Sequence, residues 1–355
     1  MLLTLENPIL QALGLKGPLI LSPLAGGPST PELISAVSNA GGLGSLGLAY
    51  ETPEQIRATI QKTRNLTSKP IAVNLFVPAI TPELSSDQIN QAIEATKKYR
   101  EELGVPSPKL EPPYALDFDK QFEEMLSQRP EVFSFTFGLL SSDYIKECKK
   151  NHIITCGTAT TLEEGILAEE SGVDWLVAQG IEAGGHRGIF SSTEEDSGIG
   201  LFPLVRSLVH KLKIPVIAAG GIMDGAGIAA VLALGASAAQ LGTAFLLCEE
   251  AGTSKPYREA LLSKNRKTKT TRAFSGRIAR GLENRFMNEM ETGNILPFPA
   301  QNVFTRDIRK RSAELGKSDF LSLWSGQGIE LIRETKAGEL VAVLFEELRT
   351  ATLSQ

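Results

Sequence analysis

The chain has 355 residues, which corresponds to one large domain or two ordinary ones at roughly 100–200 residues per domain. Hydrophobic residues make up 42% and charged residues 22% of the sequence, a balance that excludes a mainly disordered chain and is typical of a globular protein with its own core. The net charge is −5, whereas nucleic-acid binders are usually basic, so we expect no nucleic-acid partner.

Signals for membranes, secretion and disulfides are missing from the sequence. No apolar run reaches the roughly 18 residues of a membrane span, and the first fifteen residues, MLLTLENPILQALGL, do not have the layout of a secretory signal. Cys148, Cys156 and Cys248 are odd in number and lie at unrelated spacings, which is typical of buried thiols in a reducing compartment. We therefore expect a cytoplasmic protein with no membrane partner.

Short apolar runs alternate with amphipathic helical segments along the whole chain. Several runs lack polar alternation, which favours strands covered on both faces, as in a parallel sheet. Helix-start signals stand at Thr30 and Thr161, and a compact helix over 226–234 ends at Gly235. The predicted strands are 19–21, 43–46, 71–76, 132–137, 153–156, 175–178, 216–219 and 238–241.

Eight strand–helix units within about 250 residues predict an α/β fold of the TIM (β/α)8 barrel type. An open doubly wound sheet is the structural alternative. That fold would usually carry a GxGxxG turn after the first strand, whereas the sequence here reads Pro-Leu-Ala-Gly-Gly over 23–27.

The rhythm of strands and helices also predicts the domain organisation. The barrel is expected to span 1–250 together with 328–350, and the last helix, 328–348, closes it. The proline-rich segment 79–131 is interpreted as an insertion between the third and fourth strands. Residues 251–327 follow the eighth strand and are expected to form a smaller, mostly helical substrate or lid domain.

Active sites of barrels lie at the carboxyl ends of the strands, and several polar or glycine residues stand there. Asn74, Gln179 and Gln240 are uncharged amides, which suit the edge of a heterocycle, although they could equally cap loops. Glycines follow the seventh strand at 220–221 and the eighth at 242. Glycine turns of this kind can bind a phosphate with their backbone amides. The alternative interpretation is that they are tight turns without a ligand.

His186 is the one histidine in a glycine-rich loop at a strand end, where an imidazole could transfer a proton or donate to an oxyanion. His152 and His210 have no such setting, and we interpret them as structural. No set of residues has metal-ligand spacing. A GxSxG nucleophile motif is also missing from the sequence.

Taken together, these motifs resemble the nitronate monooxygenase family, formerly called 2-nitropropane dioxygenases. The blocks TRAFSGRIARGLENRF and LWSGQG are similar to the class I branch of that family. The matching segments are PLAGGPSTPELISAVSNAGGLGSLG (23–47), AVNLF (72–76), VAQGIEAGGHRG (177–188), IPVIAAGGI (214–222), AAQLGTAFL (238–246), 271–286 and 323–328.

The resemblance implies an FMN enzyme that oxidises alkyl nitronates, propionate 3-nitronate among them, with O2 to a carbonyl compound and nitrite. It further implies a detoxifying role, a monomer or homodimer, and His186 as the catalytic residue. Leu24 stands where the family commonly has Met, and the basic stretch 272–280 is a candidate for attracting the anionic substrate. The implied FMN-binding residues are Ala25, Gly26, Asn74, Gln179, Gly184, Gly221, Gln240, Leu241, Gly242 and Thr243.

Two other functions remain open at this point, and a third is excluded by the sequence. The first is an FMN-dependent NAD(P)H oxidoreductase of the quinone reductase or enoyl-acyl-carrier-protein reductase type. The second is a binding protein that keeps FMN without catalysis, or a barrel without flavin. The third, an IMP dehydrogenase-like enzyme, needs a cysteine in the loop after the sixth strand, and 180–198 contains none.

Overall fold

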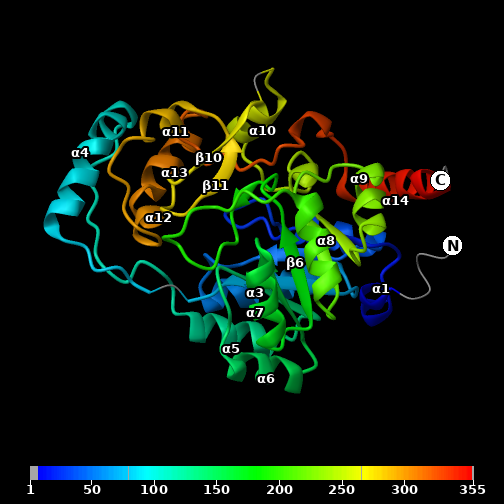
Figure 1. The fold of residues 1–355 in the computed structure, drawn as a ribbon. Helices are drawn as coiled ribbons and strands as arrows, with labels where there is room; N and C mark the ends of the chain where they lie inside the picture. Colours follow the sequence, from blue (N-terminus) through cyan, green and yellow to red (C-terminus); the bar gives the residue numbers. More distant parts are fainter. Residues whose placement is uncertain (1–6, 79, 265, 354–355) are drawn as a thin grey trace.

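Eight parallel strands form a barrel in the computed structural model (Figure 1), which describes residues 7–78, 80–264 and 266–353. The strands pair in the order β1-β9-β8-β6-β5-β4-β3-β2, and a parallel bridge from Ile20 to Leu43 joins the two edges. All eight predicted runs are strands, so the predicted TIM-barrel fold is confirmed. Their bounds are β1 Leu19–Leu21, β2 Gly44–Gly47, β3 Ile71–Phe76, β4 Val132–Thr136, β5 Ile154–Ala159, β6 Trp175–Gln179, β8 Val216–Ala219 and β9 Ala238–Leu241.

Alternate residues of each strand face two different parts of the core. Ala72 and Val177 belong to a cluster of strand residues inside the barrel. Their neighbours Val73 and Leu176 belong to a larger cluster that also contains the inner faces of the surrounding helices. Because strand side chains alternate with a period of two, this pattern fixes which residues at the strand ends point into the barrel mouth.

The helices lie around the barrel and above its carboxyl end, and several begin where the sequence predicts. The Thr30 hydroxyl accepts a hydrogen bond from the Leu33 amide, and the Thr161 hydroxyl accepts one from Glu164. The helix bounds are α1 Pro8–Leu13, α2 Pro31–Ala40, α3 Pro53–Leu66, α4 Ser86–Leu103, α5 Phe118–Gln128, α6 Ser142–Lys150, α7 Leu162–Glu170, α8 Leu201–Lys211, α9 Gly225–Ala233, α10 Lys255–Leu262, α11 Arg285–Glu289, α12 Ala300–Phe304, α13 Arg306–Glu314 and α14 Ala337–Leu353.

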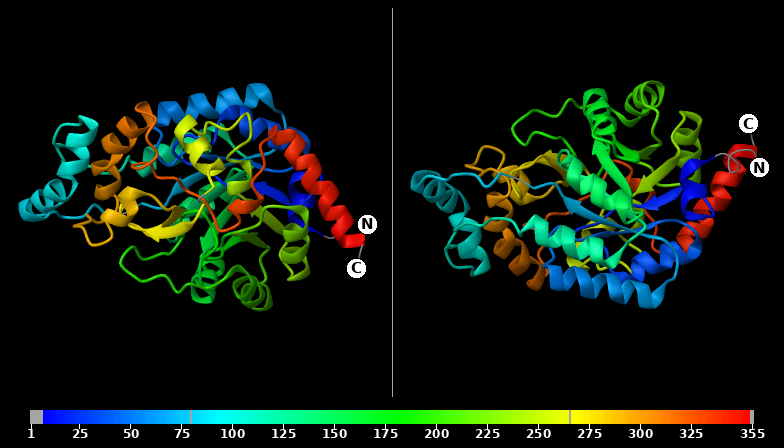
Figure 2. Two further views of the ribbon diagram at one scale, coloured as in Figure 1. Left: turned by 90° about the horizontal axis from the view of Figure 1, so that it is seen from above. Right: turned by 90° about the horizontal axis from the view of Figure 1, so that it is seen from below.

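Two segments differ from the sequence-based interpretation. Within 79–131, α5 packs against α3 and β3 and so occupies the place of the barrel's own helix, whereas α4 packs against α13 and lies apart from the barrel (Figure 2). The last helix packs between α9 and α2, and it begins at Ala337 rather than at 328. Residues 1–6 of the predicted barrel range, and residue 79 of the predicted insertion, lie outside the described residues.

A second, antiparallel sheet lies in the region predicted to be mostly helical. It pairs β10 (Thr268–Thr271) with β11 (Ala279–Leu282), and β11 with β7 (Gly185–His186). In this register Ala279 lies opposite His186. The two-residue strand β7 follows β6 of the barrel, so this pairing ties the histidine loop to the segment after the eighth barrel strand.

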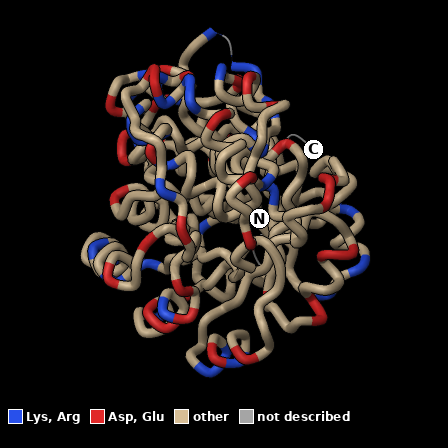
Figure 3. Tube along the Cα trace, turned by 90° about the vertical axis from the view of Figure 1, so that its left-hand side faces the viewer, with Lys and Arg blue, Asp and Glu red and all other residues tan. Residues whose placement is uncertain are grey.

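Charges are distributed over the outside of the molecule. In the view of Figure 3, Lys and Arg are interspersed with Asp and Glu along the outer helices. Among the described residues, no helix is both long and apolar enough to cross a membrane. No group of three potential metal-ligating side chains comes together in that part of the chain either.

Candidate active site

A pocket of about 630 Å³ opens at the carboxyl ends of the barrel strands. Its floor is formed by the ends of β1, β3, β6, β8 and β9, and its walls by the β7 loop, α12, α13 and residues 321–328. Almost every residue predicted for the site lines this pocket. Those residues are Ala25, Gly26, Asn74, Gln179, Gly184, His186, Gly221, Gln240, Gly242 and Thr243.

Leu241 does not line the pocket, although the sequence analysis assigned it to the cofactor. Its side chain is 1% exposed and belongs to the cluster between strands and helices. It points outward because it is the neighbour of Gln240, which lines the pocket. Any contact from this position to a ligand in the pocket would have to come from its backbone.

The three strand-end amides have different surroundings. Asn74 is 3% exposed and donates to the Ser134 hydroxyl at 2.9 Å. Gln240 lines the pocket and makes no side-chain hydrogen bond within the described part of the chain. Of the three amides, Gln240 is therefore the one whose hydrogen-bonding groups are most available to a ligand.

Gln179 instead holds the histidine loop in place. Its amide nitrogen donates to the His186 carbonyl at 2.9 Å, and its oxygen accepts from the Gly188 amide at 2.8 Å. Arg187, which is fully buried, also donates to that oxygen at 2.8 Å and pairs with Asp196 at 2.6 Å. These contacts fit the alternative interpretation of Gln179, in which its side chain caps a neighbouring loop.

The glycine turns after β8 and β9 form a cradle of free backbone amides. The N–H groups of Gly221, Gly242 and Thr243 have no acceptor among the described residues. Gly221 has φ +68°, in the left-handed region that favours glycine, and a Cβ there would lie 3.2 Å from Glu182 Cβ. Unpaired backbone N–H groups on glycine turns can bind an anionic group, so this cradle is suited to an anionic ligand.

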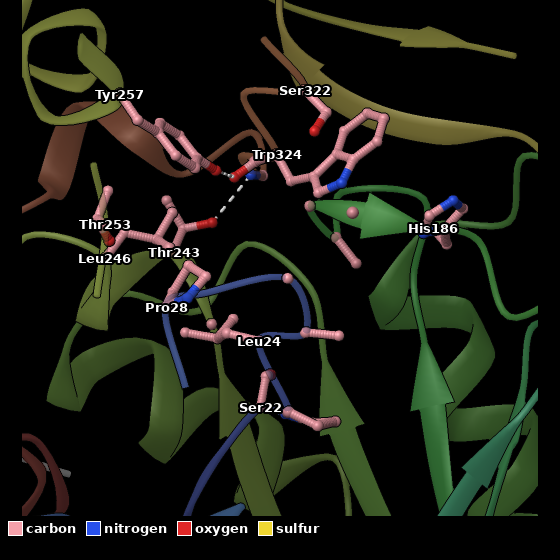
Figure 4. A pocket seen from close by; sticks show the side chains of 18 of the residues that line it. Ser22, Leu24, Pro28, His186, Thr243, Leu246, Thr253, Tyr257, Ser322 and Trp324 are labelled. Carbon is pink, nitrogen blue, oxygen red and sulfur yellow. Dashed lines mark hydrogen bonds between the residues drawn. The ribbon is translucent and has the colours of Figure 1, made fainter. Parts of the chain in front are cut away.

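Residues 324–326 run across the top of this cradle. The Gly326 amide donates to the Thr243 hydroxyl at 2.9 Å, and the Tyr257 hydroxyl donates to the Trp324 carbonyl (Figure 4). Gly184 permits the close approach, because a Cβ on it would lie 2.5 Å from the Gly326 nitrogen. The late LWSGQG block is therefore part of the pocket, and Trp324 and Tyr257 both line it.

The β1 loop carries Ala25 and Gly26, which line the pocket, and it lies beside the turn after β9, because a Cβ on Gly242 would lie 3.4 Å from Leu24 Cδ2. The Leu24 amide donates to the Ser29 hydroxyl at 2.8 Å, which closes this loop. Gly26 has φ +86°, and a Cβ on it would meet no other atom within 4 Å. Leu24 lines the pocket as well.

His186 lies in an aromatic part of the pocket. Its ring centroid is 5.4 Å from Trp324 and 5.7 Å from Phe137, and its Nε2 lies 2.7 Å from the Ser275 hydroxyl. Desolvation, and then the positive charges of Arg277 and Arg309, lower the pKa of His186 to about 3. The ring is therefore neutral at physiological pH, and a neutral imidazole offers one N–H donor and one bare nitrogen that can accept a proton.

Three cations from α13 line the pocket: Arg306, Arg309 and Lys310. Arg309 is held by Asn302, whose carbonyl and side-chain oxygens accept from Nη2 at 2.6 and 2.8 Å. Desolvation lowers the pKa of Arg309 to about 10, which still leaves it charged at neutral pH. No Asp or Glu belongs to the described lining of the pocket, so its potential is positive.

The basic stretch 272–280, which the sequence analysis considered for attracting substrate, does not line the pocket. Arg272 donates to the Ser192 carbonyl at 2.9 Å, and Arg277 donates to the Ile189 carbonyl at 2.7 Å. These arginines hold loops in place. The pocket cations could have been found from sequence, because positions 306, 309 and 310 have the spacing of one helix face.

The remaining histidines and the cysteines lie away from this site. Neither His152 nor His210 lines the pocket. The three cysteines are free and buried, and desolvation raises the pKa of the Cys156 thiol to about 12, which makes it a poor nucleophile.

Several known proteins are similar to this chain in both sequence and fold. The nitronate monooxygenase family model matches residues 7–347. A probable nitronate monooxygenase of Staphylococcus haemolyticus (strain JCSC1435) is 40% identical over 350 residues, which cover 97% of this chain and 98% of that protein. A probable nitronate monooxygenase of Staphylococcus aureus (strain MSSA476) is 39% identical over 347 residues, which cover 97% of each chain.

Two solved structures are similar to this chain in fold over nearly their whole length. Nitroalkane oxidase from Streptomyces ansochromogenes superposes with a TM-score of 0.92 at 38% identity, covering 98% of this chain and 99% of that one. FabK from Thermotoga maritima superposes with a TM-score of 0.77 at 27% identity, covering 99% and 98%. The chain is thus an oxidoreductase, and it belongs to the nitronate monooxygenase family.

Proposed function

We propose that this enzyme uses FMN to oxidise alkyl nitronates with O2, giving a carbonyl compound and nitrite, and that propionate 3-nitronate is a substrate. One observation carries the proposal. A single pocket joins a cradle of free amides, a neutral His186 and three cations, and its described lining contains no carboxylate. The cradle suits a phosphate, and the cations suit an anionic substrate.

The polar groups that lack partners support FMN as the cofactor. Besides the amides of Gly221, Gly242 and Thr243, the buried Thr253 hydroxyl lines the pocket and has no partner in the described part of the chain. Ala25, Gly26 and the side-chain amide of Gln240, which makes no hydrogen bond among the described residues, also line the pocket and offer small and polar groups to a heterocycle. Bound there, FMN would supply the redox chemistry, which protein side chains do not provide.

The cations of α13 account for substrate binding in this proposal. A nitronate is an anion, and propionate 3-nitronate carries a carboxylate as well. Arg306, Arg309 and Lys310 offer three positive charges at the mouth of the pocket. The rings of Phe76, Phe137 and Trp324 exclude water beside His186, which strengthens these electrostatic interactions.

Residues 251–327 form the upper wall of the site in this proposal. They contribute Tyr257, the α13 cations and Trp324 to the pocket, and their strand β11 pairs with β7 beside His186. We propose that this segment acts as the substrate-binding region above the barrel, which holds the cofactor.

A steady-state assay tests the proposed function. The flavin released from denatured protein is identified by chromatography, and the protein is then supplied with propionate 3-nitronate in air. We expect FMN, oxygen consumption and release of nitrite. An enzyme that is fully loaded with FMN but releases no nitrite from any alkyl nitronate would contradict the proposal.

A further inference from the structure

Ser275 is the only described residue that hydrogen-bonds to the His186 ring. It is 1% exposed and lies in the turn between β10 and β11. The turn is tightly held, because a Cβ on Gly276 would lie 2.6 Å from the Leu296 carbonyl oxygen. The Ser275 hydroxyl is therefore fixed against Nε2 at 2.7 Å.

The other partners of this hydroxyl decide which atom carries the shared proton. A serine hydroxyl has one proton to donate and two lone pairs that accept. The Arg277 amide donates to the Ser275 oxygen at 3.3 Å, and the Ser275 hydroxyl donates to the Arg277 carbonyl at 3.3 Å. No other donor to that carbonyl exists among the described residues. The lone pair that remains on the oxygen faces Nε2, and it requires Nε2 to be the donor.

The opposite arrangement leaves a polar group unsatisfied. If the Ser275 hydroxyl donated to Nε2, the Arg277 carbonyl would lose its one described donor. A buried carbonyl without a partner costs free energy. The second ring nitrogen, Nδ1, makes no hydrogen bond within the described part of the chain, and His186 lines the pocket.

We propose that Ser275 is a positioning residue, which holds His186 as the Nε2–H tautomer and leaves Nδ1 as the ring's proton acceptor toward the substrate. The orientation toward substrate rests on the proposed function, whereas the tautomer does not. Ser275 acts through His186 and is not expected to touch substrate or cofactor.

Nitrogen-15 NMR of the resting enzyme tests the tautomer directly. The chain has three histidines, and the His186→Asn variant identifies the signals of the ring in question. We expect a protonated Nε2 and a bare Nδ1 in the wild type, a mixture of tautomers in Ser275→Ala, and the wild-type pattern in Ser275→Thr. A wild-type ring protonated at Nδ1, or a Ser275→Ala spectrum without change, overturns the proposal.

Kinetics test the consequence for catalysis. In Ser275→Ala we expect kcat for a nitronate to fall by about tenfold, the worth of roughly one hydrogen bond, while KM and FMN content stay unchanged. Ser38→Ala is the matched control, because this buried hydroxyl also donates to one carbonyl and accepts from one amide. An unchanged kcat in Ser275→Ala overturns the positioning role. A wild type that oxidises no nitronate contradicts the proposed function but leaves the NMR result standing.

Discussion

His186 is held by contacts to both its backbone and its ring. Gln179 binds its carbonyl, β11 pairs with its strand, and Ser275 binds Nε2. Such a rigid, neutral imidazole is what proton acceptance or substrate orientation requires.

For His186→Asn we expect FMN to be retained and nitronate oxidation to fall by roughly 10²–10⁴-fold, the usual contribution of acid–base assistance. The retention follows because the amide cradle lies on the loops after β8 and β9. Flavin content and kcat/KM are measured on the same preparation. Turnover at the wild-type rate would remove His186 from the mechanism.

Desolvation is the main cause of the low pKa of His186, and Arg277 is one of the two positive charges that lower it further. For Arg277→Met we expect the pKa of His186 to rise from about 3 toward its ordinary 6.5, because one repulsive positive charge is lost. NMR titration of the His186 ring measures this pKa. Arg277→Lys keeps the charge and should keep the pKa low, so a pKa that does not rise in Arg277→Met contradicts this assignment.

The same shift predicts how stability depends on pH. The folded pKa of His186 lies below its unfolded value, so between about pH 3 and 6.5 the unfolded chain binds more protons at this residue. Its contribution therefore makes the folded state less stable as pH falls through that window. Chemical unfolding of wild type and His186→Asn at pH 7 and pH 5 measures it, and we expect the asparagine variant to lose less stability. Equal losses in the two proteins would contradict the shift.

For single residues, the sequence predicted most of the positions that line the pocket, but it did not predict which residues hydrogen-bond to them. Strand periodicity was enough to place Asn74 and Gln240 in the mouth, and it would have excluded Leu241. Strand periodicity could not reveal Ser275 as the partner of His186, because Ser275 and His186 are 89 positions apart in the sequence. Only the pairing of β7 with β11 brings them together.

The turns after β8 and β9 together carry the free amides of the cradle. For Gly221→Val we expect loss of FMN, because valine is strained at φ +68° and its Cβ would lie close to Glu182. Flavin content after purification is the measurement. Gly14→Val is the matched control, since Gly14 has φ +63° at the end of α1 and open space around it. Full FMN retention by Gly221→Val would argue against the phosphate site.

Helix α13 presents Arg306, Arg309 and Lys310 to the pocket. For the double variant Arg306→Met, Lys310→Met we expect KM for propionate 3-nitronate to rise by roughly tenfold with kcat little changed, and the difference to shrink at high salt. Arg311→Met is the control, because Arg311 lies on the same helix but bonds to Leu103 and Glu314 outside the pocket. An unchanged KM in the double variant would show that the α13 cations do not bind the substrate.

Elements with a strong periodic signal were predicted well, and short or distant ones were not. All eight barrel strands lie where their apolar runs predicted. The sheet formed by β10, β11 and β7 was missed, because β7 has only two residues and its pairing is with a strand more than ninety positions away. Helix α5 was assigned to an insertion because prolines surround it, whereas its packing against α3 and β3 decides its place.

The barrel and the segment above it, residues 251–327, contribute different parts of the pocket and its surroundings. The barrel provides the amide cradle and the histidine loop, while residues 251–327 provide Ser275, the α13 cations and Trp324. The fold class followed from the count of strand–helix units. The sequence also predicted residues 251–327 as a substrate or lid domain, but it did not predict their contacts with the barrel, because these depend on pairings that no local pattern encodes.

Anaerobic reduction of the bound flavin tests the central claim most directly. Under argon, the flavin absorbance is followed after separate additions of propionate 3-nitronate and of NADH or NADPH. The proposed function predicts that the nitronate alters the flavin spectrum within one turnover time and that neither nicotinamide does. Rapid bleaching by a nicotinamide, with no response to the nitronate, would contradict it and favour the NAD(P)H oxidoreductase alternative on the same barrel.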